Sequence, residues 1–273
     1  MTTLDGSPLG RATDYPDRYD PALLFPIERA AQREAIGLRG ALPFGGVDVW
    51  TAYEISWLDA RGKPEVAIGE FRVPCDSPAL VESKSLKLYI GAFAQEPAGT
   101  IDDLARRIEA DLSRACGASV AVALASLERS RAGVLTELPG ESIDAVAIAT
   151  DVYEIDAASL SAAGPSTEET LRSALFRSRC PVTGQPDTGD VMVRYRGRRI
   201  DRAGLLRYLV SYRRHAAFHE NCIERMFVDI LQRCAPQTLT VYARFMRRGG
   251  IDINPFRSNF EPEPPPGART VRQ

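Results

Sequence analysis

Cys180 is the first residue whose type and setting suggest chemistry, and it lies in the segment 177–187, RSRCPVTGQPD. Arg177 and Arg179 stand just before it, and nearby cations favour the thiolate, the nucleophilic form of cysteine. Two prolines stiffen the loop that follows, and Asp187 lies within reach of the sulfur if that loop folds back. The segment predicts either an activated nucleophile or a buried loop cysteine followed by an aspartate in a turn.

Both histidines of the chain, His215 and His219, lie in the segment 215–220. His219 and Glu220 are adjacent, so on regular structure their side chains point apart, but at the start of a helix both could face one ligand. The Glu220 carboxylate could then accept from an N–H and an NH₂ group together, as a guanine-like edge requires. The helix dipole also favours an acid in a first turn, and this alternative explains Glu220 without any ligand.

Cationic side chains gather in two further segments. Only three of the 34 basic residues are lysines, and two of these, Lys84 and Lys87, stand three positions apart on one face of a predicted helix. The segment 247–250, RRGG, combines two arginines with glycines that let a ligand approach the backbone. Either segment could bind phosphate, and the alternatives are a solvent-exposed helix face, the more usual role of such a lysine pair, and an ordinary turn flanked by surface arginines.

Hydrophobic patterning predicts that one order of elements, two strands, two helices and two strands, occurs twice. The first copy is predicted to have strands at 49–58, 65–73, 119–127 and 143–155, with helices at 78–93 and 100–115. The second is predicted to have strands at 167–179, 190–195, 238–246 and 251–256, with helices at 201–212 and 220–234. Thr100 and Gly117 are typical helix-capping residues. The expected fold is α+β, with antiparallel sheets and helices on one face.

The chain is accordingly predicted to have four parts. Residues 1–46 form an N-terminal arm, broken by prolines, with one short helix at about 27–36. Residues 47–156 form an N-terminal module and residues 167–273 a C-terminal module that contains Cys180. A small and polar linker at 157–166 joins the two modules.

Composition limits the classes of protein to which the chain can belong. Of its 273 residues, 44% are hydrophobic and 26% charged, which predicts a folded globular protein. A net charge of −2 argues against a nucleic-acid binder held by excess positive charge. No apolar run approaches the roughly 18–20 residues that span a bilayer, and the polar N-terminus lacks the apolar core of a signal peptide, so a soluble cytoplasmic protein is expected.

The cysteines and histidines argue against disulfide frameworks and metal sites. Five cysteines, an odd count at wide spacings without a CxxC pair, do not form a disulfide pattern. With only two histidines in addition, no metal site is expected.

Four segments, taken together and in this order, resemble one family. They are ESKSLKLY at 82–89, CPVTGQPD at 180–187, FHE at 218–220 and RRGGIDINP at 247–255. Together they are similar to the long, two-module form of the NADPH-dependent 7-cyano-7-deazaguanine reductases, which reduce a nitrile to a primary amine in queuosine biosynthesis. The likeness covers nearly the whole chain after the arm. It implies two tandem units of the tunnelling fold, each of the order ββααββ.

The resemblance also implies a role for individual residues. Cys180 would attack the nitrile carbon and form a covalent thioimide, and Asp187 would donate the proton. The substrate would be bound by Val81, Glu82 and Ser83 from one module and by His219 and Glu220 from the other. Ser83, Lys84, Arg248 and Gly249 would bind NADPH as a co-substrate, with two NADPH used per turnover. The family further implies a homodimer, without direct contact to nucleic acid or to a membrane.

Three other functions stay open at this point. A nitrile hydrolase would use the same Cys180 adduct and let water attack it. A relative of the same fold could act on pterins or GTP, although its zinc-dependent form needs cysteine and histidine ligands. A non-enzymatic tRNA-binding module could use the arginines of the segment 194–214. A separate hypothesis is that Cys180 and Cys222 form a reversible disulfide that protects the nucleophile.

Overall fold

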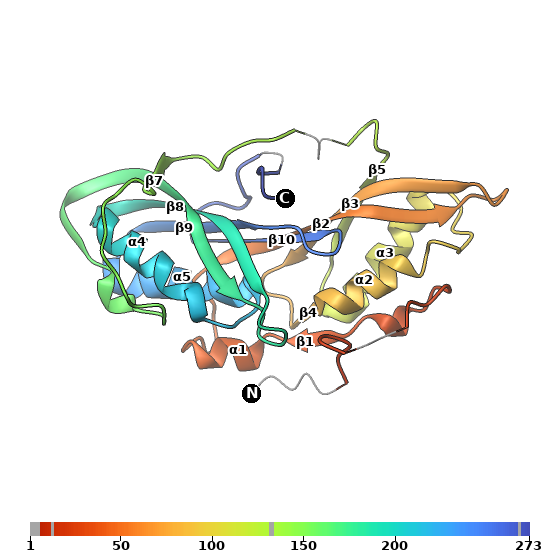
Figure 1. Ribbon diagram of the computed structural model, residues 1–273, viewed down its shortest axis with the longest axis horizontal. Helices are drawn as coiled ribbons and strands as arrows, with labels where there is room; N and C mark the ends of the chain where they lie inside the picture. Colours follow the sequence, from red (N-terminus) through yellow and green to blue (C-terminus); the bar gives the residue numbers. More distant parts are fainter. Residues whose placement is uncertain (1–5, 12–13, 131–133, 267–268) are drawn as a thin grey trace. The chain divides into compact units, whose positions relative to one another are not determined.

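The computed structural model of the chain describes residues 6–11, 14–130, 134–266 and 269–273. It is an α+β structure with largely antiparallel sheets, as expected from the sequence (Figure 1). The chain divides into two compact units. The first comprises Met1–Gly37, Asp48–Gly133 and Arg247–Ile253, and the second comprises Leu38–Val47, Val134–Met246 and Asn254–Gln273. The division into an arm, two modules and a linker stays a prediction.

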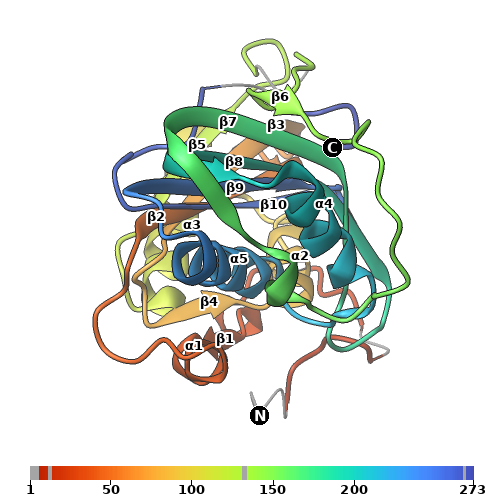
Figure 2. The ribbon, with the colours of Figure 1, turned by 90° about the vertical axis from the view of Figure 1, so that its left-hand side faces the viewer.

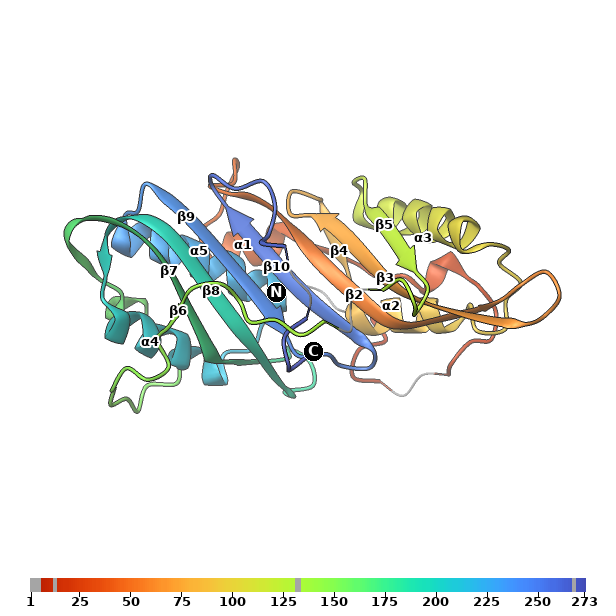
Figure 3. The same ribbon diagram turned by 90° about the horizontal axis from the view of Figure 1, so that it is seen from above.

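The first unit contains a sheet in the order β5-β3-β2-β10 and two longer helices (Figure 3). Its strands are β2 (Gly45–Leu58), β3 (Pro64–Pro74), β5 (Ala121–Ala125) and the start of β10 (Ile251–Ser258), and its helices are α2 (Ser83–Gly91) and α3 (Ile101–Cys116). The N-terminal part adds η1 (Pro21–Leu23), β1 (Pro26–Glu28) and α1 (Ala30–Ala35), and β1 pairs with β4 (Ala79–Val81) in a separate two-stranded sheet. Trp50, Phe71, Tyr89 and Leu104 belong to the apolar core of this unit.

The second unit contains a sheet in the order β10-β9-β8-β7-β6. Its strands are β6 (Glu141–Ser142), β7 (Ala162–Arg179), β8 (Pro186–Ile200), β9 (Thr238–Phe245) and the rest of β10; its helices are η2 (Ala157–Ser159), α4 (Arg202–Ser211), η3 (Tyr212–Arg214) and α5 (His219–Cys234). The pairs β7–β8, β8–β9 and β9–β10 are antiparallel, and β6 joins β7 in parallel. Figure 2 shows α4 and α5 on one face of this sheet and the C-terminal residues on the other.

The helix boundaries follow from local capping chemistry. The Thr100 side chain accepts from the Asp103 backbone N–H, and the Asp103 carboxylate accepts in return from the Thr100 backbone, so α3 opens with a capping box. Gly117 ends the same helix in the left-handed region at φ 67°. The helix predicted at 78–93 begins later, because Ala79–Val81 is β4 and Glu82 caps α2. The arm helix predicted at 27–36 is also shorter, since β1 occupies its first residues.

In the part of the chain that the structure describes, one predicted strand is absent, and another begins earlier than predicted. Within the described residues, 143–155 forms no strand; Val146 N–H bonds to the Ile143 carbonyl in a turn, and the place beside β2 is taken by β10. The strand predicted at 167–179 begins earlier, at Ala162 of β7, within the segment 157–166 predicted to be a linker. The pairing of β7 with β8 shifts between Ala163 and Ser166, so Gly164 and Pro165 form a bulge inside a long strand. None of the described helices is long and apolar enough to cross a membrane.

Candidate functional site

The hairpin of β7 and β8 holds Cys180 at its tip. Arg179 pairs with Pro186 and Ser178 with Asp187, so the residues between them form the connecting loop. Cys180 N–H donates to the Gln185 carbonyl at 2.9 Å, and Gly184 N–H donates to the Cys180 carbonyl at 3.1 Å. The loop therefore folds back, and Asp187 lies in β8 opposite Ser178 of β7. Such a fold is what Asp187 needs in order to come near Cys180. The Cys180 side chain is buried there, with 7% of the residue exposed.

Backbone bonds bring the start of α5 to the same hairpin end. Arg179 N–H donates to the His215 carbonyl at 2.9 Å, and Ala217 N–H donates to the Arg179 carbonyl at 3.1 Å. Residues 215–217 therefore run beside the last residue of β7, immediately before Cys180. The segments 177–187 and 215–220, which the sequence singled out separately, meet in this part of the second unit.

His219 faces Asp187 across this junction. The distance from His219 Nε2 to Asp187 Oδ2 is 3.6 Å, and Asp187 is buried, with a side chain 3% exposed. The His219 ring also packs on the Phe245 ring of β9, with centroids 4.0 Å apart. The structure therefore places the side chains of His219 and Asp187, two of the predicted site residues, next to each other.

Glu220 and Cys222 lie buried in the first turn of α5. Burial raises the pKa of the Cys222 thiol to about 12, the charges of Asp187 and Glu220 add to this rise, and the charge of Arg225 opposes it. Cys222 is therefore close enough to Asp187 and Glu220, two of the predicted site residues, for their charges to affect its pKa. All five cysteines lie among the described residues and are free thiols, and the Cys180–Cys222 disulfide stays a prediction.

In the first unit, the predicted substrate residues lie where β4 ends and α2 begins. The carboxylate of Glu82, which is fully buried, accepts from the backbone N–H groups of Lys84 at 2.5 Å and Ser85 at 2.9 Å. The Ser83 hydroxyl donates to Glu82 Oε1 at 3.3 Å. Glu82 is thus the N-cap of α2, a role that the sequence reasoning missed, because Ser, Thr, Asp and Asn are the usual N-cap residues and Glu is not.

Two contacts in the first unit involve the residues predicted to bind the cofactor. The Lys84 ammonium donates to the Arg11 carbonyl of the N-terminal part. Gly249 lies in the turn between β9 and β10 at φ 58°, and a Cβ placed there would come within 3.2 Å of Lys87 Cδ and Cε. Lys87, the other member of the lysine pair, therefore lies along this glycine, and Arg248 closes the turn by its N–H bond to the Ile251 carbonyl at 2.9 Å.

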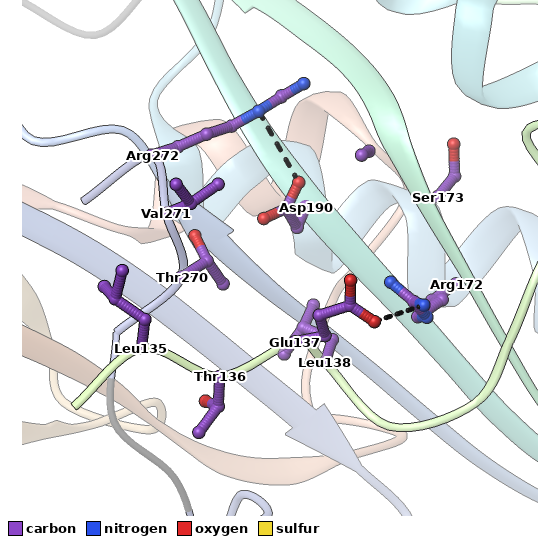
Figure 4. A pocket seen from close by; sticks show the side chains of 11 residues that line it. Leu135, Thr136, Glu137, Leu138, Arg172, Ser173, Asp190, Thr270, Val271 and Arg272 are labelled. Carbon is purple, nitrogen blue, oxygen red and sulfur yellow. Dashed lines mark hydrogen bonds and ion pairs between the residues drawn. The ribbon is translucent and has the colours of Figure 1, made fainter.

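A cavity of about 390 Å³ lies elsewhere in the second unit, between β7, β8 and the C-terminal residues (Figure 4). Arg172 pairs with Glu137 at 2.6 Å, and Arg272 approaches Asp190 at 3.8 Å. The sequence-predicted site residues are not among the described residues that line it. In the same described part of the chain, no group of three or more His, Cys, Asp or Glu side chains is placed to hold a metal ion.

Comparison with known proteins gives consistent matches over both units. The family model described as "Nitrile reductase, 7-cyano-7-deazaguanine-reductase N-term" matches residues 15–124, and the model described as "QueF-like protein" matches residues 186–264. A crystal structure of the archaeosine synthase QueF-Like in the apo form covers 37% of this chain and 99% of its own, at 18% identity and a TM-score of 0.31.

Curated relatives cover almost the full length. The NADPH-dependent 7-cyano-7-deazaguanine reductase of Burkholderia vietnamiensis is 55% identical over 269 residues, which are 98% of this chain and 98% of that protein. The reductase of the same name from Burkholderia multivorans is 55% identical over the same length and share of both chains. With this identity over both compact units, the chain belongs to the family of NADPH-dependent 7-cyano-7-deazaguanine reductases.

Proposed function

We propose that this protein reduces the nitrile of 7-cyano-7-deazaguanine to the aminomethyl group with NADPH, a reaction that serves queuosine biosynthesis. The observation that carries the proposal is the hairpin end of the second unit. There a buried cysteine, an aspartate–histidine pair and a buried glutamate are brought to one place by backbone bonds of Arg179. The near full-length identity to reductases of that name supports the same conclusion.

Cys180 serves as the nucleophile in the proposed reaction. Its sulfur adds to the nitrile carbon, one C≡N electron pair moves to nitrogen, and Asp187 supplies the proton that nitrogen takes up. The product is a covalent thioimide, which accepts hydride more readily than the nitrile because its C=N carbon is more electrophilic once nitrogen is protonated. NADPH would supply hydride when bound, and two equivalents are needed. After the first hydride has added to the thioimide carbon, the C–S bond breaks, which releases the Cys180 thiolate and leaves an imine that the second hydride reduces to the amine.

His219 and Glu220 hold the deazaguanine in this proposal. Glu220 accepts from the N–H and NH₂ groups of the pyrimidine edge, and His219 keeps Asp187 oriented through their 3.6 Å contact. Val81, Glu82 and Ser83 contribute from the first unit. The capping bonds of Glu82 do not exclude this, because Oε2, which accepts from the Ser85 N–H, has a second lone pair that can accept from a substrate N–H.

Ser83, Lys84, Arg248 and Gly249 bind the cofactor in this proposal. The turn fits a phosphate group, because Gly249 leaves its backbone accessible and Lys87 lies directly beside it. Two cationic side chains, Lys84 and Arg248, would pair with the phosphates of NADPH, including the ribose phosphate that distinguishes it from NADH.

The deciding experiment mixes the protein with 7-cyano-7-deazaguanine and NADPH and follows NADPH absorbance and product mass. We expect cofactor oxidation with formation of the amine, and an intact-mass adduct on the wild-type protein that Cys180→Ala lacks. Ammonia release without cofactor oxidation would show a nitrile hydrolase instead. Salt-dependent binding of tRNA without any turnover would favour the non-enzymatic alternative. Sedimentation tests the expected homodimer.

A further inference from the structure

Helix α5 carries two buried glutamates one turn apart. Glu220 is 2% exposed and Glu224 3% exposed, and their spacing of four places both on one face of the helix. A carboxylate taken out of water is costly unless a partner compensates its charge. Glu220 lies in a segment that stands out in the sequence, whereas Glu224 does not.

The partner of Glu224 is Arg257, a fully buried arginine of β10. Its Nε and Nη2 groups donate to Glu224 Oε1 at 3.1 and 2.9 Å, and its Nη1 group donates to the Phe256 carbonyl at 2.9 Å. The ring of Phe44 lies over the guanidinium at 5.7 Å and packs edge-on against Phe227 of α5 at 5.2 Å. The guanidinium is therefore fixed to the strand at one end and to the helix at the other.

This arrangement fixes a position more than it adds stability. A buried ion pair often contributes no more to folding than well-packed apolar side chains of the same size. A planar guanidinium that bonds through two N–H groups, however, sets the rotation and height of the helix on the sheet. The N-cap position of α5 is held by Phe218, whose apolar side chain offers no oxygen to the first N–H groups. The contact one turn further on is therefore well placed to hold the first turn.

We infer that Arg257 and Glu224 are a positioning pair that seats α5 on β10 and so holds Glu220 in register for the substrate. Neither residue touches the substrate; they act through the helix. The inference rests on the proposed role of Glu220 in binding the deazaguanine. It adds two residues to the determinants of substrate binding, and both belong to the second unit.

The test replaces the pair by apolar side chains and measures both Michaelis constants. In Glu224→Leu/Arg257→Met we expect a melting temperature close to that of the wild type, because no charge is left buried alone. The Michaelis constant for 7-cyano-7-deazaguanine should rise about tenfold or more, since a small displacement of a binding group is costly, while that for NADPH stays unchanged. A double variant with both constants unchanged overturns the inference.

Two further variants keep the test decisive. Arg257→Lys retains the charge and loses the two-point contact, so we expect it to raise the substrate constant also, and it decides the question if the double variant does not fold. Tyr208→Phe is the matched control, because Tyr208 donates to Asp229 further along α5 at 2.7 Å. Tyr208→Phe should leave both Michaelis constants unchanged. If it weakens substrate binding as much as the Arg257 and Glu224 variants do, any loosening of α5 has this effect, and the specific positioning role is refuted.

Glu220→Gln separates this inference from the function on which it rests. If this variant binds the substrate as the wild type does, the proposed role of Glu220 fails. If it weakens substrate binding while the Arg257 and Glu224 variants bind normally, only the positioning pair fails.

Discussion

Burial makes several cysteine thiols of this protein weak acids. It is the largest cause of the raised pKa of Cys222, about 12, and of Cys116 and Cys234, each about 11. The reactive form of cysteine is the thiolate, so these three side chains stay neutral and unreactive at physiological pH. The proposed nucleophile, Cys180, is distinguished from them by its place at a hairpin end.

Alkylation of the folded protein at about pH 8 should therefore discriminate among the cysteines. We expect iodoacetamide to modify Cys180 and to leave Cys222 unmodified until the protein is denatured, because a thiol with a pKa of about 12 ionises only in strong alkali. Bound 7-cyano-7-deazaguanine should block the modification of Cys180. Peptide mass mapping measures both; modification of Cys222 ahead of Cys180 in the folded protein contradicts the assignment.

The chemistry of single residues was the part most open to sequence reasoning. Cys180, Asp187, His219 and the lysine pair stand out by type and setting, and the structure brings the first three to one place. Arg257 could not be found in this way, because it is one of 31 arginines and its significance depends on Glu224, a partner distant in sequence. Pairing between distant residues carries no local signal.

Among the elements, helix α3 has the most explicit boundary. Thr100 and Asp103 exchange side-chain to backbone bonds of 3.2 and 3.0 Å at its start. Thr100→Ala should lower the free energy of unfolding by about 1 kcal/mol, since it leaves N-terminal N–H groups uncapped, and Thr100→Ser should largely restore it. Denaturant unfolding measures both. A loss of Cys180 adduct formation in Thr100→Ala would show an effect beyond the stability of this helix.

The turn between β9 and β10 allows a matched comparison of two glycines. Gly249 and Gly250 both have positive φ, 58° and 80°, so alanine strains the backbone at either position. A Cβ at Gly249 also displaces Lys87, whereas nothing lies within 4 Å of a Cβ at Gly250. Gly249→Ala should therefore raise the Michaelis constant for NADPH more than Gly250→Ala does. If both variants raise the Michaelis constant for NADPH equally, the position of Lys87 does not matter for cofactor binding.

Local signals explain which elements the sequence predicted. Helix caps at Thr100 and Gly117 are read from a few neighbouring residues, and α3 agrees with its prediction. The prediction of a strand at 143–155 is wrong because the Asp144 carboxylate accepts from Ser173 Oγ at 2.6 Å and from Ala174 N–H at 3.0 Å. These bonds attach an irregular segment to the side of β7. That β10 lies beside β2 depends on residues about 200 positions apart, and no local pattern encodes it.

At the scale of the whole molecule, the pH dependence of stability depends partly on Asp190. Burial raises its pKa despite the opposing charge of Arg272, whose Nε lies 3.8 Å from Asp190 Oδ1. The folded state therefore holds this proton more tightly, and stability falls as pH rises from the unfolded pKa of about 3.9 through the higher folded value. Asp190→Asn should raise the free energy of unfolding at neutral pH and equal the wild type in acid below that window. A variant destabilised at neutral pH would show that the Arg272 contact dominates.

The two compact units carry different parts of the proposed reaction. Cys180, Asp187, His219 and Glu220 belong to the second unit, whereas Ser83, Lys84, Arg248 and Gly249 belong to the first. Formation of the covalent adduct needs the nucleophile and a proton donor, and hydride transfer needs the cofactor residues as well. Variants of the first unit can therefore separate the two steps.

Lys84→Ala should leave the Cys180 adduct intact and raise the Michaelis constant for NADPH, because it removes an ammonium proposed to pair with phosphate. Lys84→Arg should restore it only in part if the site requires a compact cation. Lys63→Ala is the control, since Lys63 is a 61% exposed lysine paired with Glu65. Intact mass measures the adduct and steady-state kinetics the constant. If Lys84→Ala retains normal NADPH kinetics, the lysine is an ordinary surface residue, and its bond to the Arg11 carbonyl is its main role.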